Sequence, residues 1–194
     1  MRIIAGKYRG RRLLPVPGKK TRPTGDRVRE ALFSVLGETV AESRVLDLFA
    51  GTGALGLEAL SRGAARAVMV ESDPGARAVI EANIAALGAG NTARLLSAAF
   101  PAALEILAAA GEEFDLVLAD PPYRSGAGGN LLDELAGFAI LAPDGVAVIE
   151  HPPETGPVPP GPGWQLLQRK QYGRTVLSFF TWSGYRSRKS QPAR

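Results

Sequence analysis

The strongest constraint on the fold is a regular alternation of two sequence patterns between residues 43 and 151. Short apolar runs of strand length alternate with stretches whose apolar residues recur at helical spacing. Strands that alternate with helices predict an α/β fold with a parallel, doubly wound sheet. The expected strands are RVLDLFA, AVMVES, ARLLSA, FDLVLAD and GVAVIEH, and the helices between them are ALGLEALSRG, PGARAVIEANIAALG, FPAALEILAAAG and NLLDELAGFAIL.

The segments on either side of this region add elements of other kinds. Residues 24–36 have apolar side chains at helical spacing, with Thr24 placed as an N-cap and Gly37 as a C-terminal stop. MRIIAG and RRLLPV predict a short N-terminal β-hairpin, and residues 164–182 predict an antiparallel strand pair. We therefore expect three parts, a basic hairpin arm, a main α/β domain and a basic tail, over residues 1–20, 21–183 and 184–194.

The composition excludes several classes of protein. The 194 residues are 45% hydrophobic and 22% charged, which is ordinary for a soluble globular domain. Apolar runs fall short of the roughly 18 residues that a membrane span needs, and no apolar segment follows the basic N-terminus as in a secretory signal. The chain has no cysteine, which excludes disulfides and thiolate metal sites. We expect a cytoplasmic, monomeric protein that needs no metal ion.

Positive charge is concentrated at the two ends of the chain. The net charge is +4, but residues 1–30 hold ten Lys and Arg against two acids, and residues 169–194 hold seven against none. Basic ends on an acidic body favour a polyanionic partner such as nucleic acid. For the last eight residues we prefer simple solvation. The candidate RNA-contacting residues of the arm are Lys7, Arg9, Arg11 and Arg12.

A glycine-rich loop follows the first expected strand. Gly51-x-Gly53-x-x-Gly56 lies between a strand and a helix, and Glu71 ends the next strand. Glycines let a ligand approach the backbone, a helix N-terminus offers free N–H groups, and such a carboxylate accepts hydrogen bonds from ribose hydroxyls. The pattern fits a dinucleotide, S-adenosylmethionine (SAM) or a tight turn without ligand. Asp47 favours SAM, because a carboxylate there would repel a pyrophosphate but can face an ammonium and a sulfonium.

Five stretches of the sequence resemble one family. They are MRIIAGKYRGRRL, RPTGDRVREALFSVL, DLFAGTGALGLEALSRGA, DLVLADPPY and QYGRTVLSFF, and together they span nearly the whole chain. The chain resembles class I SAM-dependent methyltransferases and, more closely, the RsmD family of bacterial enzymes that methylate guanine N2 in 16S ribosomal RNA. The glycine loop and DPPY occur in several families of amino-group methyltransferases. The N-terminal arm and RPTGDRVREALF are the stretches that point to the RsmD family among them.

The resemblance implies a fold, a cofactor and site residues. The fold is a Rossmann-like, mostly parallel seven-stranded sheet with an antiparallel last strand. The cofactor is SAM, released as S-adenosylhomocysteine, and the partner is 16S ribosomal RNA or the small-subunit particle. The residues implied to hold the methionine end of SAM are Asp47, Ala50, Gly51, Thr52 and Gly53, and those implied at the ribose and adenosine are Glu71, Ser72 and Asp73.

Two positions compare with the family in opposite ways. Phe49 stands where the generic motif has glycine, and RsmD-like sequences share this phenylalanine. Family members often carry an acid after the third strand, near the adenine amino group, whereas this chain has Ala98 and Ala99. Recognition of adenine at that point would therefore use backbone groups.

The DPPY motif that ends the fourth expected strand fits a site for a planar amine. An exocyclic amine is a poor nucleophile because its lone pair is delocalised into the ring. Hydrogen bonds from the amine to the Asp120 carboxylate and the Pro121 carbonyl can aim that lone pair, and Tyr123 can stack on the base. Arg124 could pair with a neighbouring phosphate. The alternative is a rigid surface turn, since Asp-Pro pairs are common turn formers.

Several other residues carry weaker signals. Arg22, Thr24 and Arg27 either grip RNA phosphate or close over the cofactor, or they cap a helix and supply surface charge. His151 is the only histidine, and we expect an incidental loop residue rather than one that faces a cleft. Four aromatic residues in strand patterns are expected in the core: Trp164, Phe179, Phe180 and Trp182.

Three functions compete at this point. The first is methylation of guanine N2 in small-subunit ribosomal RNA, with the target base turned out of its stack to reach Asp120. The second is methylation of DNA adenine N6 or of a protein glutamine amide, for which the same motif chemistry would serve. The third is a catalytically silent RNA-binding assembly factor.

Overall fold

The protein is described from a computed structural model, which covers residues 1–18, 24–122, 131–154, 161 and 163–183. The chain divides into two compact units, residues 1–103 and 104–194, and each is described by itself. The predicted tail, residues 184–194, lies outside the described residues, so the division into arm, main domain and tail stays a prediction. Among the described helices, none has the length and apolar character needed to cross a membrane.

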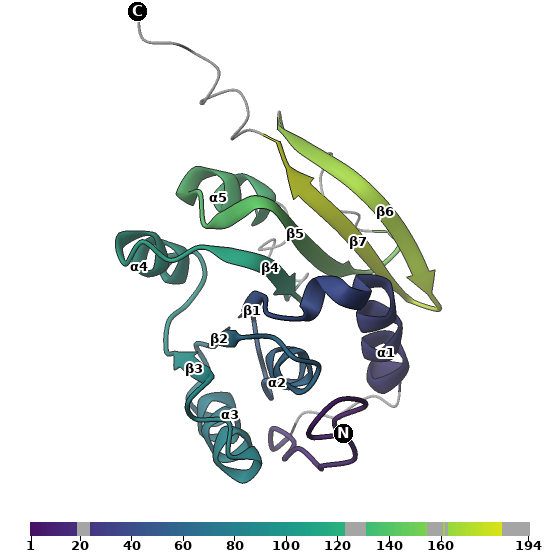
Figure 1. Cartoon of the computed structure of the whole chain (residues 1–194), viewed down its shortest axis with the longest axis vertical. Helices are drawn as coiled ribbons and strands as arrows, with labels where there is room; N and C mark the ends of the chain where they lie inside the picture. The colour runs from purple at the N-terminus through teal and green to yellow at the C-terminus, as the bar shows by residue number, and fades with distance from the viewer. Residues whose placement is uncertain (19–23, 123–130, 155–160, 162, 184–194) are drawn as a thin grey trace, which may run out of the picture. The chain divides into compact units, whose positions relative to one another are not determined.

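The first unit contains the N-terminal segment and the first strand–helix repeats (Figure 1). Its strands β1, β2 and β3 pair in parallel, with β2 in the middle. The strands β1 and β2 are buried at their last four positions, which explains their nearly continuous apolar sequence. The elements are α1 (Thr24–Leu36), η1 (Gly37–Val40), β1 (Arg44–Leu48), α2 (Ala54–Ser61), β2 (Arg66–Val70), α3 (Pro74–Leu87) and β3 (Ala93–Leu96), and α4 (Ala102–Ala109) begins at its end.

The second unit contains the remaining strands and one helix. Here β5 pairs in parallel with β4 and antiparallel with β7, and β7 pairs antiparallel with β6. The expected helix NLLDELAGFAIL is shorter than predicted, because Ala139 has a φ of +53° and strand β5 already begins at Leu141. The elements are β4 (Phe114–Ala119), α5 (Leu131–Phe138), β5 (Leu141–His151), β6 (Trp164–Tyr172) and β7 (Thr175–Trp182).

The strand order confirms the predicted fold class. The sheet has seven strands in the order β3-β2-β1-β4-β5-β7-β6, mostly parallel, and the last strand of the chain, β7, is antiparallel. Trp164, Phe179 and Phe180 lie in the core as expected. Trp182 is only half-buried, so its assignment to the core is corrected, and its ring lies 5.1 Å from that of Trp164.

The N-terminal segment, residues 1–18, folds as a hairpin-shaped turn rather than as two regular strands. We call it the arm. It forms one isolated antiparallel bridge, between Arg2 and Arg12, and the described backbone hydrogen bonds across the arm stop at Ile3, which donates to Arg11 O and accepts from the Gly10 N–H. The reason is that the next backbone N–H groups are donated to α2 instead: those of Ile4 and Ala5 to the Glu58 carboxylate, at 2.8 and 3.0 Å. Backbone N–H groups of the arm therefore attach it to α2, including that of Lys7, which donates to Ser61 O at 2.8 Å.

Glu58 is the centre of this attachment. Its carboxylate is 0% exposed and is compensated by Arg29 at 3.5 Å and Arg62 at 2.8 Å in addition to the arm. A second helix residue, Ser61, accepts from the backbone of Tyr8 at 2.9 Å through its Oγ. A buried charge is tolerable only when paired and hydrogen-bonded, so the arm backbone is part of what stabilises Glu58 inside the fold.

Replacing Glu58 by alanine should therefore destabilise the protein strongly. The change removes the acceptor for two arm N–H groups and one of the two carboxylates that pair with the buried Arg29, the other being Asp26 at 3.2 Å. We expect a loss of about 3–5 kcal/mol in the free energy of unfolding, measured by urea denaturation. The matched control is Glu38→Ala on the exposed 3₁₀ helix, expected within about 0.5 kcal/mol of wild type. A loss below about 1 kcal/mol for Glu58→Ala would contradict this account.

Candidate functional site

The glycine loop begins immediately after β1. Phe49 has a φ of +62°, a conformation that bulky side chains rarely adopt. The Ala50 N–H donates to Val70 O at 2.9 Å, and the Gly53 N–H donates to Ala50 O at 2.8 Å, which closes the turn into α2. The loop is thus held against the end of β2 by backbone hydrogen bonds, and the chain turns through a strained residue to achieve this.

The three glycines of the loop have different physical roles. Gly53 has a φ of +76°, and a Cβ there would lie 2.8 Å from Met69 Sδ. At Gly56 a Cβ would lie 2.9 Å from Met69 Cγ, so both glycines let α2 pack closely on β2. For Gly51 the nearest described atom to an added Cβ is Phe49 O at 4.0 Å. The open side of the loop, where a ligand could approach the backbone, is therefore at Gly51.

Glu71 joins the glycine loop to the start of α3. Its Oε2 accepts the Gly51 N–H at 2.9 Å, and its Oε1 accepts the N–H groups of Ser72 and Asp73, each at 2.9 Å. Each carboxylate oxygen has two acceptor sites, so the half-buried Glu71 retains one site for a further donor such as a ribose hydroxyl. The Asp73 carboxylate caps α3 by accepting the Ala76 N–H at 2.8 Å.

Asp47 lies inside the first unit rather than on its surface. It is buried on β1, and its Oδ2 accepts the Gly56 N–H at 2.9 Å. The carboxylate thereby ties the strand to the second turn of the helix that the loop opens. A structural role is thus established for Asp47, and its assignment to the methionine end of SAM stays a prediction.

The segment after β3 supplies an aromatic residue that the sequence analysis missed. Ala98 is half-buried and Ala99 exposed, and the Ala98 N–H donates to Leu96 O at 3.0 Å. The next residue, Phe100, places its ring 5.4 Å from that of Phe49, with both rings half-buried. The available signal was an aromatic residue directly after a short strand. The two rings add an apolar wall to the side of the loop on which Ala98 and Ala99 were expected.

The start of the DPPY motif is described within the second unit. Strand β4 is almost entirely buried, and Asp120 becomes exposed directly after it, followed by a buried Pro121. Since Ala119 lies opposite Ile149 in the parallel pair, Asp120 leaves the strands at the carboxyl end of β5. Tyr123 and Arg124 lie outside the described residues, so their predicted roles are untested.

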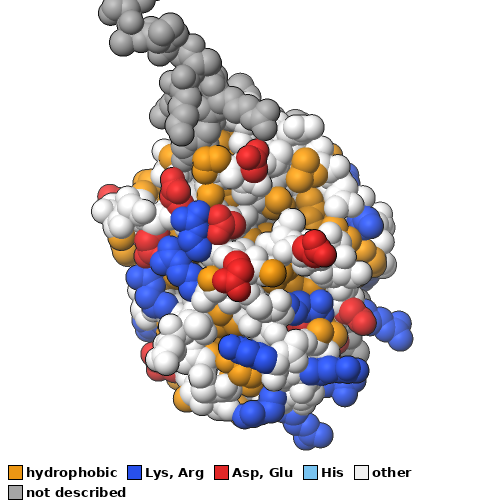
Figure 2. All heavy atoms as spheres, in the orientation of Figure 1, with side chains coloured by type: hydrophobic (Ala, Val, Ile, Leu, Met, Phe, Trp, Pro, Cys, Tyr) orange, Lys and Arg blue, Asp and Glu red, His pale blue; other side chains and the backbone are white. Residues whose placement is uncertain are grey.

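Basic side chains gather over the arm. Figure 2 shows Lys and Arg clustered at the lower end of the visible face, where the arm lies. The exposed cations of this surface are Arg2, Lys7, Arg9, Arg11, Arg12 and Arg27. A groove of about 400 Å³ runs between the arm and α1, and its lining includes Arg2, Arg9 and Arg27 together with Asp26 and Glu30.

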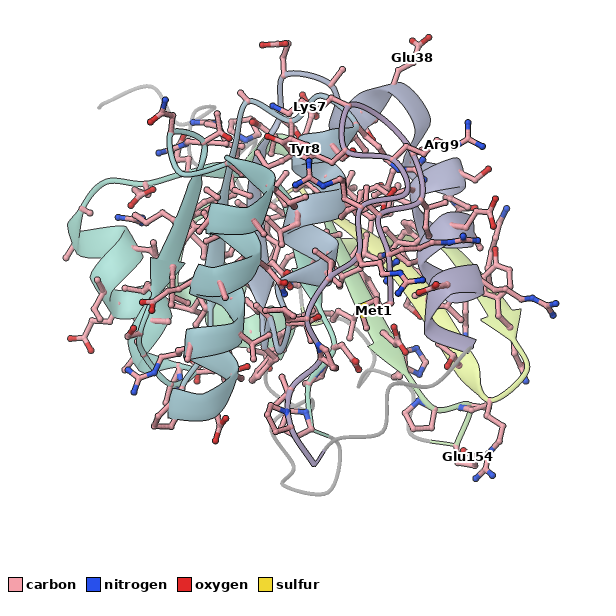
Figure 3. The ribbon with its side chains drawn as sticks, turned by 90° about the horizontal axis from the view of Figure 1, so that it is seen from below. Met1, Lys7, Tyr8, Arg9, Glu38 and Glu154 are labelled. Carbon is pink, nitrogen blue, oxygen red and sulfur yellow. The ribbon has the colours of Figure 1, made fainter. Side chains whose placement is uncertain are left out.

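The predicted RNA-contacting residues differ in the contacts that their side chains make. Lys7 lies over the Tyr8 ring, 4.7 Å from its centroid, and Figure 3 shows both with Arg9 on the arm. Arg11 donates through Nη2 to Ala86 O at the end of α3, so its side chain is tied down. Arg22 and the side chain of Thr24 lie outside what the structure describes.

His151 is not an incidental loop residue, and this expectation is corrected. It ends strand β5, is 1% exposed, and contacts Ser178 Oγ through Nε2 at 2.8 Å. Its Nδ1 lies 2.8 Å from Pro152 O, which assigns the proton to Nδ1 because a carbonyl only accepts. Burial lowers the pKa of His151 below 6.5, with a smaller lowering by the charge of Arg169, and both outweigh the raising effect of the Pro152 carbonyl.

The comparisons with known proteins agree with this geometry. The family model described as conserved hypothetical protein 95 matches residues 1–181. The chain belongs to this family. It is 40% identical to ribosomal RNA small subunit methyltransferase D of Escherichia coli, over 93% of this chain and 89% of that protein. The protein of the same name from Haemophilus influenzae is 33% identical over 89% of each chain. The resemblance to the RsmD family is therefore confirmed.

A similar solved structure supports the fold assignment. The Escherichia coli protein yhhF, described as a candidate methyltransferase, matches with a TM-score of 0.82 and 38% identity over 94% of this chain and 98% of its own. The seven-stranded sheet is thus a Rossmann-like, class I methyltransferase fold, as the sequence predicted.

The buried, neutral His151 should make stability depend on pH. Since its folded pKa lies below its unfolded value of 6.5, the unfolded chain binds a proton that the folded one does not. Its contribution is complete above pH 6.5 and is lost as pH falls from there towards the folded pKa. We expect the unfolding free energy of wild type to fall more between pH 7.5 and 5.5 than that of His151→Asn, by urea denaturation. Parallel pH profiles for the two proteins would show that the histidine is not responsible.

Proposed function

We propose that this protein transfers a methyl group from SAM to the exocyclic N2 of a guanine in small-subunit ribosomal RNA. The observation that carries the proposal is the 40% identity, over 93% of the chain, to a ribosomal RNA small subunit methyltransferase, together with a glycine loop whose open side faces a ribose-type carboxylate. The choice of guanine N2 comes from the family resemblance of the motifs. We expect the enzyme to be monomeric and cytoplasmic.

The residues of the first unit fit the cofactor. Gly51 leaves its side of the loop open, Glu71 has one acceptor site left for a ribose hydroxyl, and Asp47 and Glu71 supply negative charge for a cationic ligand. Backbone groups of Ala50, Gly51, Thr52 and Gly53 would hold its methionine end, and Ser72, Ala98, Ala99 and the Phe49 ring its adenosine. When bound, SAM supplies an electrophilic methyl group on a sulfonium.

The chemistry of the second unit fits the acceptor. Asp120 lies exposed at the end of a buried strand, and Pro121 is held in place by burial. The Asp120 carboxylate and the Pro121 carbonyl would accept the two N–H groups of the guanine amine and so direct its lone pair at the methyl carbon. Tyr123 would stack on the base. In this reaction the amine nitrogen would take the methyl carbon from the sulfonium, leaving S-adenosylhomocysteine, and would lose its proton to solvent. Because Asp120 and Pro121 orient the amine, positioning would supply most of the acceleration.

The arm would hold the RNA around the target. Its exposed cations and the groove beside α1 offer phosphate contacts that carry no sequence information but fix the register of the RNA. The partner would be 16S ribosomal RNA, either naked or in the small-subunit particle.

Transfer of labelled methyl from SAM to small-subunit particles, naked ribosomal RNA and DNA tests the proposed reaction. We expect label in ribosomal RNA, at guanine N2 after digestion and mass spectrometry. Asp120→Ala should lower the turnover rate by about 100-fold or more, because the amine loses its orienting acceptor, with SAM affinity within about twofold of wild type.

Asp133→Asn, which changes an exposed carboxylate on α5, is the matched control and should keep full activity. Label in DNA adenine or in protein would show that the acceptor is not guanine N2 but belongs to the second candidate substrate class. Tight RNA binding without any transfer would point to an assembly factor.

Removing a cation from the groove should weaken RNA binding in a salt-dependent way. When a phosphate contact is lost, RNA binding releases fewer counterions. Arg9→Ala and Arg27→Ala should therefore each reduce the magnitude of the slope of log affinity against log salt concentration by about 1. Filter binding to a ribosomal RNA fragment at several salt concentrations measures this slope. The control is Arg174→Ala, an exposed arginine at the turn between β6 and β7, for which the slope should not change. Unchanged slopes for both groove variants would remove the groove from the RNA site.

A further inference from the structure

Asn83, a residue of α3, bridges the arm and the glycine loop. It is 1% exposed, and its Oδ1 accepts the Leu14 N–H at 2.7 Å. Its Nδ2 donates to Leu14 O at 3.3 Å and to Thr52 O at 3.0 Å. Only this orientation of the amide satisfies all three contacts, because the oxygen faces a donor and the nitrogen faces two acceptors. One buried side chain therefore fixes the backbone of two segments that are far apart in the sequence.

The contact with Thr52 completes the positioning of the loop. Two peptide groups earlier in the loop, Glu71 accepts the Gly51 N–H. A weaker contact joins the same segments, since Thr52 Oγ1 lies 3.5 Å from Met1 Sδ in the arm. The loop that would hold the methionine end of SAM is thus fixed partly by groups that the arm also uses.

The arm is attached in a way that lets its seating vary. Near its start it is anchored by the buried Ile3, by the Glu58 carboxylate and by Arg29, which donates to Arg2 O. Its contacts with Ser61 and Asn83 are neutral hydrogen bonds, which contribute only about 0.5–1.5 kcal/mol each, and its cations are exposed. A ligand on the arm can therefore change how Leu14 is presented to Asn83.

We propose that Asn83 couples the seating of the arm to the geometry of the glycine loop, so that a correctly seated arm raises the affinity for SAM. The inference rests on the proposed function only in taking SAM as the ligand of the loop. Where RNA prefers the seated arm, RNA strengthens SAM binding by some factor, and by thermodynamic reciprocity SAM strengthens RNA binding by the same factor. Asn83 is a positioning residue, since it acts through Thr52 and touches no substrate.

Two glycines of the arm provide a matched pair for the test. Gly6 and Gly10 have φ values of +78° and +81°, so replacing either by alanine costs similar backbone strain. A Cβ at Gly6 would lie 1.7 Å from Ser61 O, whereas at Gly10 no described atom lies within 4 Å. Gly6→Ala therefore displaces the arm from α2, and Gly10→Ala does not.

The experiment is calorimetric titration of the full chain with SAM alone, without RNA. Gly6→Ala and Asn83→Ala should each weaken SAM binding by about fivefold or more, and adding Asn83→Ala to Gly6→Ala should weaken it less than about twofold further. Gly10→Ala and Asn91→Ala, a change of an exposed asparagine after α3, should stay within about twofold of wild type. Ser61→Ala, which removes the acceptor for the Tyr8 N–H, serves as a milder second variant and should weaken SAM binding in the same direction.

The coupling is wrong if Gly6→Ala and Ser61→Ala bind SAM as wild type does, or if the losses from Gly6→Ala and Asn83→Ala add fully. Additive losses would mean two independent structural defects. This failure is distinguishable from that of the proposed function. Tight SAM binding without methyl transfer to RNA would leave the coupling standing, and normal transfer with additive losses would remove the coupling alone.

Discussion

The site depends on the parallel register of β1 and β2. Leu48 and Val70, the last residues of the two strands, lie opposite each other, so the loops that follow them start at the same level. A carboxylate one residue past β2 can then reach a backbone N–H three residues past β1, as Glu71 does at Gly51. A shift of one residue in this pairing would move the two strand ends about 3.3 Å apart along the strand direction and separate the carboxylate from the loop, so the register of the strands also fixes the geometry of the site.

The sequence was sufficient for the elements and for the near-neighbour features of the site. Strands buried on both faces must be apolar along their length, and helices must keep an apolar stripe, so the alternation was readable. The glycine spacing and Glu71 were readable because strand, turn and helix follow each other directly. The structure of the arm could be predicted less well from the sequence. Two strands were expected, but Glu58, more than 50 residues away, accepts the N–H groups of Ile4 and Ala5 and so ends the pairing across the arm.

The residues that sequence reasoning missed share one property. Glu58 and Asn83 are isolated polar residues within apolar stretches, and each is buried with partners distant in sequence. A single carboxylate in ALGLEALS and a single amide in NIAAL look like ordinary helix residues, because local periodicity says nothing of what lies opposite. Their isolation was nevertheless a signal, since a polar side chain that is buried is nearly always hydrogen-bonded to a partner.

Three polar side chains of the first unit accept from or donate to backbone groups in the glycine loop and the start of α2, and this suits the proposed chemistry. Asp47 holds Gly56, Glu71 holds Gly51, and Asn83 holds Thr52, so the strained turn at Phe49 is kept by hydrogen bonds on several sides. Apolar packing alone would leave such a loop free to relax, because it does not orient individual peptide groups. Methyl transfer that relies on positioning needs the cofactor held in one orientation. The polar ties therefore stabilise the conformation of the loop more than they stabilise the fold.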